Sequence, residues 1–232
     1  MIGTPNRLAI VALGPSSHDY IVDTESAGGR HVLFDQVWVV NTYAGILDHD
    51  ILLHMDDLRA QEARAAAGNR KIGALLAALR THGKPIITSR AYPDYPASVA
   101  FPLEQAVNAL DCINAFDSTV DYGMALALML KAREITLYGC DFNWRGASEV
   151  EPGRSSLSYW VGRAQERGVI VKIARHSTLM NAAGKPGPRF YGYDGADVKV
   201  QVLDGRARVT MTPREPPAAG EIEQRYSHQR AA

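Results

Sequence analysis

The amino-acid sequence predicts an α/β fold: a doubly wound, mostly parallel sheet with a small C-terminal β-hairpin extension. The first observation is that short, continuous apolar runs of strand length recur along the chain and alternate with segments of helical composition. Strands that are covered on both faces have this pattern, which is typical of parallel sheets. The second is that Gly, Asn, Asp or Ser follows most of these runs, so polar groups collect at the carboxyl ends of the strands. Ligands bind at those ends in open α/β sheets.

The bulk composition describes an ordinary soluble globule. The chain has 232 residues, of which 46% are hydrophobic, and this suffices for one α/β domain with small appendages. The 25 Lys and Arg side chains balance the 25 Asp and Glu side chains, so charge does not indicate a nucleic-acid partner or an anionic membrane. The two cysteines form neither a disulfide framework nor a metal motif, no signal peptide opens the chain, and no apolar run spans a membrane. We therefore expect a cytoplasmic protein.

Residues 116–144 are the stretch around which the other predictions are arranged. Nearly every residue of the segment 120–130 is apolar, which predicts a helix that is buried over most of its surface. Ser118 and Thr119 precede this segment as N-cap and first turn, and the N-terminus of a helix binds anions. We therefore expect these two residues to bind phosphate, while an ordinary core helix is the alternative.

A buried strand, predicted over residues 135–138, follows this helix. The strand ends at Gly139, and Asp141 comes shortly afterwards. A carboxylate just beyond the carboxyl end of a central strand stands where a ligand binds, so we interpret Asp141 as a ligand-site residue. The alternative is an ordinary turn aspartate.

The first predicted strand, over residues 8–13, leads into the tight turn Gly14, Pro15, Ser16. Glycine lets the backbone approach a ligand, proline fixes the bend, and serine supplies a hydroxyl and an N–H group for phosphate. The turn is neither a Walker A loop nor a GxGxxG motif, so a turn without a ligand is also open.

Two further strands, predicted over residues 37–40 and 51–55, end in polar side chains. Asn41 follows the first, and Asp56 and Asp57 follow the second. A pair of carboxylates can hold Mg²⁺ or Mn²⁺ against a diphosphate. We expect Asp56 to hold the metal or the donor, and Asp57 to share the metal, to act as a base or to cap the next helix. The alternative is that both carboxylates are structural.

The remaining elements complete the sheet. They are helices over residues 58–80 and 158–167, and strands over residues 85–88 and 169–173. Residues 92–96, rich in Tyr and Pro, form a candidate substrate lid, with a mobile surface loop as the alternative.

The chain divides into three predicted segments. Residues 1–183 form the α/β domain. Residues 184–212 contain an aromatic loop and a β-hairpin, because Asp204 and Gly205 form a dipeptide that favours a type I′ turn. Residues 213–232 are rich in Pro, Glu, Gln, Arg and Ala, which predicts a disordered tail.

Four of these segments occur in the same order in one known superfamily. They are the turn at residues 14–16, Asn41, the Ser118 and Thr119 pair ahead of an apolar helix, and the block LYGCDF at residues 137–142. In these segments the chain resembles the bacterial sialyltransferases that use CMP-sialic acid, the motility accessory factors that glycosylate flagellin, and the archaeal-type 6-hydroxymethylpterin pyrophosphokinases. Similar His-Met-Asp-Asp and Tyr-Gly-Tyr segments occur in phage-encoded proteins.

The resemblance covers residues 8–181 and implies a Rossmann-like sheet that binds a nucleotide across its strand ends. The positions that match the family's contacts are Gly14, Pro15 and Ser16 against the nucleotide, Asn41 as its hydrogen-bond partner, and Ser118 and Thr119 for phosphate.

The chain also departs from the sialyltransferases at positions that carry their chemistry. Where they have a His general base, this chain has Gly153, Arg154 and Ser155. Phe116 stands in place of an arginine, and Asn143 in place of a tyrosine that contacts phosphate. Another group must therefore act as the base if the chain catalyses transfer.

The predicted function is transfer of a group from an activated nucleotide donor, and the leading hypothesis is a nucleotide-sugar glycosyltransferase. The alternatives are ATP-dependent pyrophosphoryl transfer to a small hydroxymethyl compound, and nucleotide binding without catalysis. In an enzyme, Arg154 and a Mg²⁺ or Mn²⁺ ion would stabilise the departing phosphate, and Asp57 or His54 would accept the proton of the acceptor. The partner is then a nucleotide-activated small molecule, while the acceptor stays open and a homo-oligomer is possible.

Overall fold

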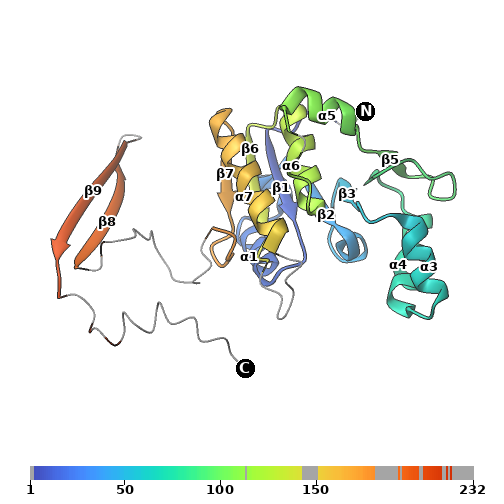
Figure 1. The fold of residues 1–232 in the computed structure, drawn as a ribbon, viewed down its shortest axis with the longest axis horizontal. Helices are drawn as coiled ribbons and strands as arrows, with labels where there is room; N and C mark the ends of the chain where they lie inside the picture. Colours follow the sequence, from blue (N-terminus) through green and yellow to red (C-terminus); the bar gives the residue numbers. More distant parts are fainter. Residues whose placement is uncertain are drawn as a thin grey trace. The chain divides into compact units, whose positions relative to one another are not determined.

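The computed structural model describes residues 3–112, 114–142, 151–180, 193, 195–203, 206–215, 218 and 220. Contacts divide the chain into two compact units, Met1–Gly184 and Lys185–Ala232, and each is described by itself. The first unit holds a large sheet and the second holds a β-hairpin (Figure 1).

The first unit is built on a seven-stranded sheet with the order β5-β4-β3-β2-β1-β6-β7. Every neighbouring pair of strands in it is parallel. The chain therefore winds outward from β1 in two directions, which confirms the predicted doubly wound parallel sheet. The strands are β1 Arg7–Val11, β2 Gln36–Val40, β3 Ile51–Leu53, β4 Ile86–Thr88, β5 Ser98–Ala100, β6 Glu134–Tyr138 and β7 Ile170–Ile173.

The central strands are continuously apolar because both faces of the sheet are covered. All residues of β1 after Arg7 are buried, and β2 and β6 are buried in the same way. Successive side chains of a strand point to opposite faces. Leu8 and Ile10 accordingly belong to one core, and Ala9 and Val11 belong to the other.

Helices cover both faces of the sheet (Figure 1). One core takes side chains from α5, α6 and α7, and the other takes side chains from α1, α3 and α4. The helices are α1 His18–Ser26, α2 Arg30–Leu33, α3 Leu58–Ala66, α4 Arg70–Arg80, α5 Leu103–Leu110, α6 Thr119–Met129 and α7 Glu151–Glu166, with short 3-10 helices η1 Pro15–Ser17 and η2 Asn41–Gly45. None of the helices in the described part of the chain has the length and apolar character needed to cross a bilayer.

Helix α6 is the buried helix that the apolar segment predicts. Gly123 lets it approach the sheet closely, because an added Cβ would lie 2.6 Å from Leu53 Cδ1 in β3. The helix ends close to the start of β6, which follows it after a short connection at Leu130–Arg133. Its N-terminus at Ser118 and Thr119 therefore lies toward the opposite, carboxyl edge of the sheet.

The prediction of one helix over residues 58–80 is wrong, because the segment forms two helices, α3 and α4. Gly68 lies between them with a φ of +100°, a conformation that glycine adopts readily and that ends a helix. Asn69 then caps α4, since its side-chain oxygen accepts a hydrogen bond from the N–H of Ile72 at 3.2 Å.

Other elements differ from their predicted bounds or have no predicted counterpart. The helix predicted over residues 158–167 already begins at Glu151. Helix α1 was not expected, because its β-branched and short polar residues have low helix propensity. Strand β5 has three residues at the edge of the sheet and lacks a buried apolar run.

The second unit contains a two-stranded antiparallel sheet. Strand β8 spans Ala196–Leu203 and pairs with β9, which spans Arg206–Pro213. This pairing confirms the predicted C-terminal hairpin extension. The predicted turn residues Asp204 and Gly205 lie outside the described residues, as does most of the tail predicted for residues 213–232.

Substitution of Asn69 by Ala should lower the free energy of unfolding by about 1 kcal/mol, because α4 loses its N-cap oxygen. Urea denaturation measures this difference. Asn108→Ala, at an exposed position inside α5, is the matched control and should leave stability unchanged or slightly raised. Equal effects of the two substitutions would contradict the capping role.

Candidate ligand site at the carboxyl edge of the sheet

The strand order marks one place at the carboxyl edge of the sheet. Strands β1 and β6 are neighbours, but the chain leaves β1 toward α1 on one face and leaves β6 toward α7 on the other. Such a point is the topological switch point, where ligands bind in open α/β sheets. We call the carboxyl ends of β1, β2, β6 and β7, with the loops that follow them, the switch-point edge.

The loops after β1 and β6 are held in direct contact. The N–H of Gly14 donates to the carbonyl of Gly139 at 2.8 Å, and the N–H of Ser16 donates to Asp141 Oδ2 at 2.8 Å. The Ser16 hydroxyl accepts a hydrogen bond from the N–H of Gly139 at 3.0 Å. The polar groups predicted to bind phosphate at Ser16 thus join two loops, and contact of Gly14, Pro15 and Ser16 with a ligand stays a prediction.

Asp141 connects three loops of this edge. It is buried, with 1% of its surface exposed, and its Oδ1 accepts from the N–H of Thr178 at 3.2 Å while Oδ2 accepts from Ser16. Its backbone carbonyl accepts from the Thr178 hydroxyl at 2.5 Å. One carboxylate therefore joins the loops after β1, β6 and β7, and its predicted contact with a ligand is not yet tested.

Arg154, near the start of α7, braces the same loops. Its guanidinium donates to the carbonyls of Asp141 and Phe142, both at 2.9 Å, and to those of Thr178 and Leu179 at 2.5 and 3.3 Å. These bonds give Arg154 a bracing role, and its predicted contact with a departing phosphate stays a prediction.

Two residues of the edge have strained backbones. Asn41 after β2 and Phe142 after β6 have φ values of 50° and 49°, which are uncommon for residues other than glycine. Such strain gathers at functional sites. Asn41 Oδ1 is also buried without a hydrogen-bond partner among the described residues. A buried acceptor without a donor is costly in a protein interior, so this atom is suited to a donor on a ligand.

The N-terminus of α6 has the capping pattern that the sequence predicts. Ser118 is the N-cap, and its N–H and hydroxyl donate to Asp121 Oδ2 at 2.7 and 3.0 Å. Ser156 of α7 donates to the same oxygen at 2.7 Å. Burial raises the pKa of Asp121 to about 7, although the hydrogen bonds from Ser156 and Ser118 oppose this shift.

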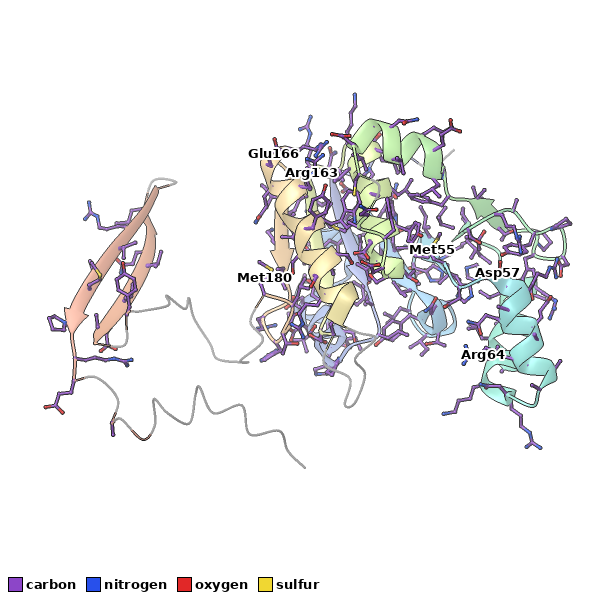
Figure 2. The ribbon with its side chains drawn as sticks, viewed as in Figure 1. Met55, Asp57, Arg64, Arg163, Glu166 and Met180 are labelled. Carbon is purple, nitrogen blue, oxygen red and sulfur yellow. The ribbon has the colours of Figure 1, made fainter. Side chains whose placement is uncertain are left out.

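The two aspartates after β3, Asp56 and Asp57, differ in their contacts. Asp57 caps α3, accepting from the N–H groups of Arg59 and Ala60 at 2.8 and 3.2 Å, and its other oxygen pairs with Arg90 at 2.9 Å. Figure 2 shows Asp57 at the start of that helix. Asp56 is exposed.

The capping contacts confirm that Asp57 caps α3, one of the roles expected for it, and its use as a metal ligand or a base is untested. Within the described residues, no three His, Cys, Asp or Glu side chains gather in a way that could hold a metal ion. Mg²⁺ or Mn²⁺ at Asp56 and Asp57 thus stays a prediction without a complete ligand set.

His54 is fully buried, and neither ring nitrogen has a partner among the described residues. Burial lowers its pKa, and the nearby charge of Asp56 opposes this effect. The imidazole therefore favours its neutral form, and its burial separates it from an acceptor in solvent.

A pair that the sequence does not reveal joins α1 to the loop after β7. His176 Nδ1 lies 2.6 Å from Asp19 Oδ1, and the backbone N–H of His176 donates to Asp19 Oδ2 at 3.0 Å. Although burial raises the pKa of Asp19, the hydrogen bonds from His176 hold it below its usual value. The only sequence signal is that polar residues follow the strand at residues 169–173, because α1 itself is not predicted.

Gly14→Ala should destabilise the protein by about 1–3 kcal/mol, because the new Cβ would lie 2.4 Å from Asp141 Oδ2 and 2.5 Å from the carbonyl of Gly139. Urea denaturation measures the loss. Gly162→Ala in α7 is the control, since its Cβ would meet nothing within 4 Å and alanine favours a helix. A Gly14→Ala protein as stable as wild type would show that the loops can separate freely.

Asp121 should make the protein less stable as the pH rises from about 4 to 8. Its folded pKa of about 7 exceeds the unfolded value of 3.8, so its stabilising contribution is complete below the unfolded value and is lost as the pH passes the folded value. Unfolding free energies of wild type and Asp121→Asn, compared across this range, should diverge by a few kcal/mol.

Asp111→Asn, at an exposed residue in a left-handed conformation that asparagine tolerates, is the control for this pH series. It should keep the wild-type dependence on pH. Parallel curves for wild type and Asp121→Asn would contradict the raised pKa.

No family model matches the sequence. No curated protein matches it either. Among solved structures, the chain is similar to the sialyltransferase CstII from Campylobacter jejuni, whose structure was determined in complex with the substrate analogue CMP-3FNeuAc. The identity is 12%, the TM-score is 0.44, and the alignment covers 95% of this chain and 98% of that chain.

Proposed function

We propose that this protein binds a nucleotide-activated small molecule at the switch-point edge and transfers its activated group, with a nucleotide sugar as the donor. The main support for this proposal is the conformation and environment of Asn41. It stands at the carboxyl end of β2, next to β1, in a left-handed conformation and with a buried oxygen that lacks a donor. An amino group of a base or a hydroxyl of a ribose supplies the hydrogen bond that this oxygen lacks.

The phosphates of such a donor have a place at the N-terminus of α6. The first N–H groups of a helix have no partners within it, and they carry a partial positive charge. Ser118 and Thr119 are the proposed phosphate contacts there. The raised pKa of Asp121 supports this placement, because a carboxyl that titrates near neutrality repels an incoming phosphate less than a fully ionised one.

In the proposed reaction, the bond between the transferred group and the donor phosphate breaks, and the phosphate leaves with the bonding electron pair. Fixed N–H groups and guanidinium groups stabilise such charge most when they are held in advance of the reaction. Arg154 is held by four carbonyls and is the proposed cation of the site. Asp56, exposed at the end of β3, is the proposed carboxylate for a metal ion on a diphosphate donor.

Asn41→Gly should weaken nucleotide binding about tenfold, which is the loss of one buried hydrogen bond. Glycine keeps the left-handed backbone conformation, so the substitution removes the amide without straining the chain. Isothermal titration calorimetry with CMP-N-acetylneuraminic acid, UDP-glucose, GDP-mannose and ATP, each with and without Mg²⁺, measures the affinity.

Asn108→Ala, at an exposed position on α5 outside the switch-point edge, is the matched control for this series and should bind like wild type. The proposal fails if no probe binds, or if Asn41→Gly binds as tightly as wild type. If ATP is the one probe that binds, the activity is ATP-dependent transfer and not transfer from a nucleotide sugar. If a probe binds but no donor is consumed, the protein binds nucleotides without catalysing transfer.

A further inference from the structure

We propose that His176 and Asp19 form a proton-transfer pair at the switch-point edge, in which His176 accepts the proton of the acceptor hydroxyl and Asp19 positions its ring. This inference rests on the transfer function proposed above. It assigns the general base to a pair of residues joined only by the fold, since 157 positions separate them in the sequence.

The two residues contrast in exposure. The side chain of Asp19 is 4% exposed, whereas that of His176 is 73% exposed. A buried carboxylate 2.6 Å from Nδ1 fixes the ring and, of the two tautomers, favours the one that carries its proton on Nδ1. Nε2 is then left with a free electron pair on a ring that is open to solvent.

The pair lies beside the loops that Asp141 joins. Asp19 is in the first turn of α1, directly after η1 and the Gly14 turn. His176 is two residues before Thr178, whose N–H binds the Asp141 carboxylate. Both partners therefore belong to the switch-point edge, and each lies close in sequence to a residue that bonds the Asp141 carboxylate.

Anchoring of the loop alone does not require the imidazole. The backbone N–H of His176 already bonds Asp19 Oδ2, and Arg175 pairs with Asp23 Oδ1 at 2.7 Å. The Ser177 hydroxyl also donates to the carbonyl of Cys140 at 3.3 Å. These contacts fix the loop without the ring of His176, whose side chain is exposed to solvent.

Charged groups surround the ring of His176. Asp19 Oδ1 lies 2.6 Å from Nδ1. Arg175 Nε lies 3.7 Å from the same Asp19 oxygen, and Arg175 also pairs with Asp23, which accepts from the Tyr138 hydroxyl at 3.0 Å. Asp19 thus contacts both the guanidinium of Arg175 and the ring of His176. In a proton-transfer pair, a carboxylate in this place orients the imidazole that takes the proton.

The other candidate bases are less suited to this step. His54 is fully buried, and Asp57 has both oxygens engaged by the α3 cap and Arg90.

In the proposed step, the acceptor oxygen forms a bond to the transferred carbon while that carbon's bond to the donor phosphate breaks. The phosphate leaves with the bonding electrons, and the hydroxyl proton moves to His176 Nε2.

Two measurements test the pair. In ¹⁵N spectra of the histidine rings, neutral His176 should carry its proton on Nδ1, with Nε2 unprotonated. Saturating CMP-N-acetylneuraminic acid, UDP-glucose, GDP-mannose or ATP should shift the Nε2 resonance of His176. The same probes should leave that of His31, exposed on α2 toward the amino edge, unchanged.

In turnover, His176→Asn should keep an N–H for Asp19 but cannot accept a proton. We expect it to lower kcat for nucleotide release about 100-fold or more, to leave Kd within about twofold, and to abolish the fall of kcat at acidic pH. His31→Asn should match wild type. Asp19→Asn, which removes the charge that holds the ring, should lower kcat and shift the pH profile.

The outcomes separate the two proposals. If no probe binds wild type, or no bound donor is consumed, the transfer function fails and the base assignment falls with it. If a probe binds and is consumed, but His176→Asn keeps the wild-type kcat and pH profile, the base assignment alone is overturned. It is likewise overturned if neutral His176 carries its proton on Nε2, or if its resonance ignores a bound probe.

Discussion

The ligand edge of this protein depends on a single buried carboxylate. The Asp141 carboxylate accepts hydrogen bonds from the N–H groups of Ser16 and Thr178, so the loops after β1 and β7 are fixed to the loop after β6. A carboxylate accepts such bonds more strongly than a neutral group, and removing one partner would leave a buried charge unsatisfied. Gly14 meets the same constraint sterically, because only a residue without a side chain fits against Asp141 and Gly139.

Two kinds of local conflict meet in Asn41. Left-handed backbones occur in Asn41, Asp111, Lys131 and Phe142. Buried side-chain atoms without a partner among the described residues occur in Asn41, His54, Asp121 and Arg163. Asn41 is the one described residue that belongs to both groups. Folded proteins tolerate such local conflicts mainly at functional sites, where the surrounding core keeps the strained residues in place. The position of Asn41 at the carboxyl end of β2 agrees with a ligand at that edge of the sheet.

The sheet was predictable from the sequence, and much of the candidate site was not. Central strands and α6 are read from local composition, because burial on both sides requires continuous apolar residues. A helix cap is also local, so the capping of α3 by Asp57 was among the roles foreseen for it. The pairing of Asp19 with His176, in contrast, depends on which strands become neighbours, and no spacing in the sequence encodes it. The break at Gly68 shows that a stop signal outweighs helical composition on either side.

The order of strands also determines when the ligand edge can form. Ser16 and its partner Asp141 are 125 residues apart, whereas β1 and β2 are close in sequence. Loop-closure entropy opposes the distant pairing more than the near one, so β1 and β2 can associate while β6 is still unmade. Until β6 emerges from the ribosome, the other side of β1 is an open, apolar strand edge that can capture a foreign strand. Completion of the ligand edge and protection of the nascent chain from aggregation are therefore the same event in synthesis.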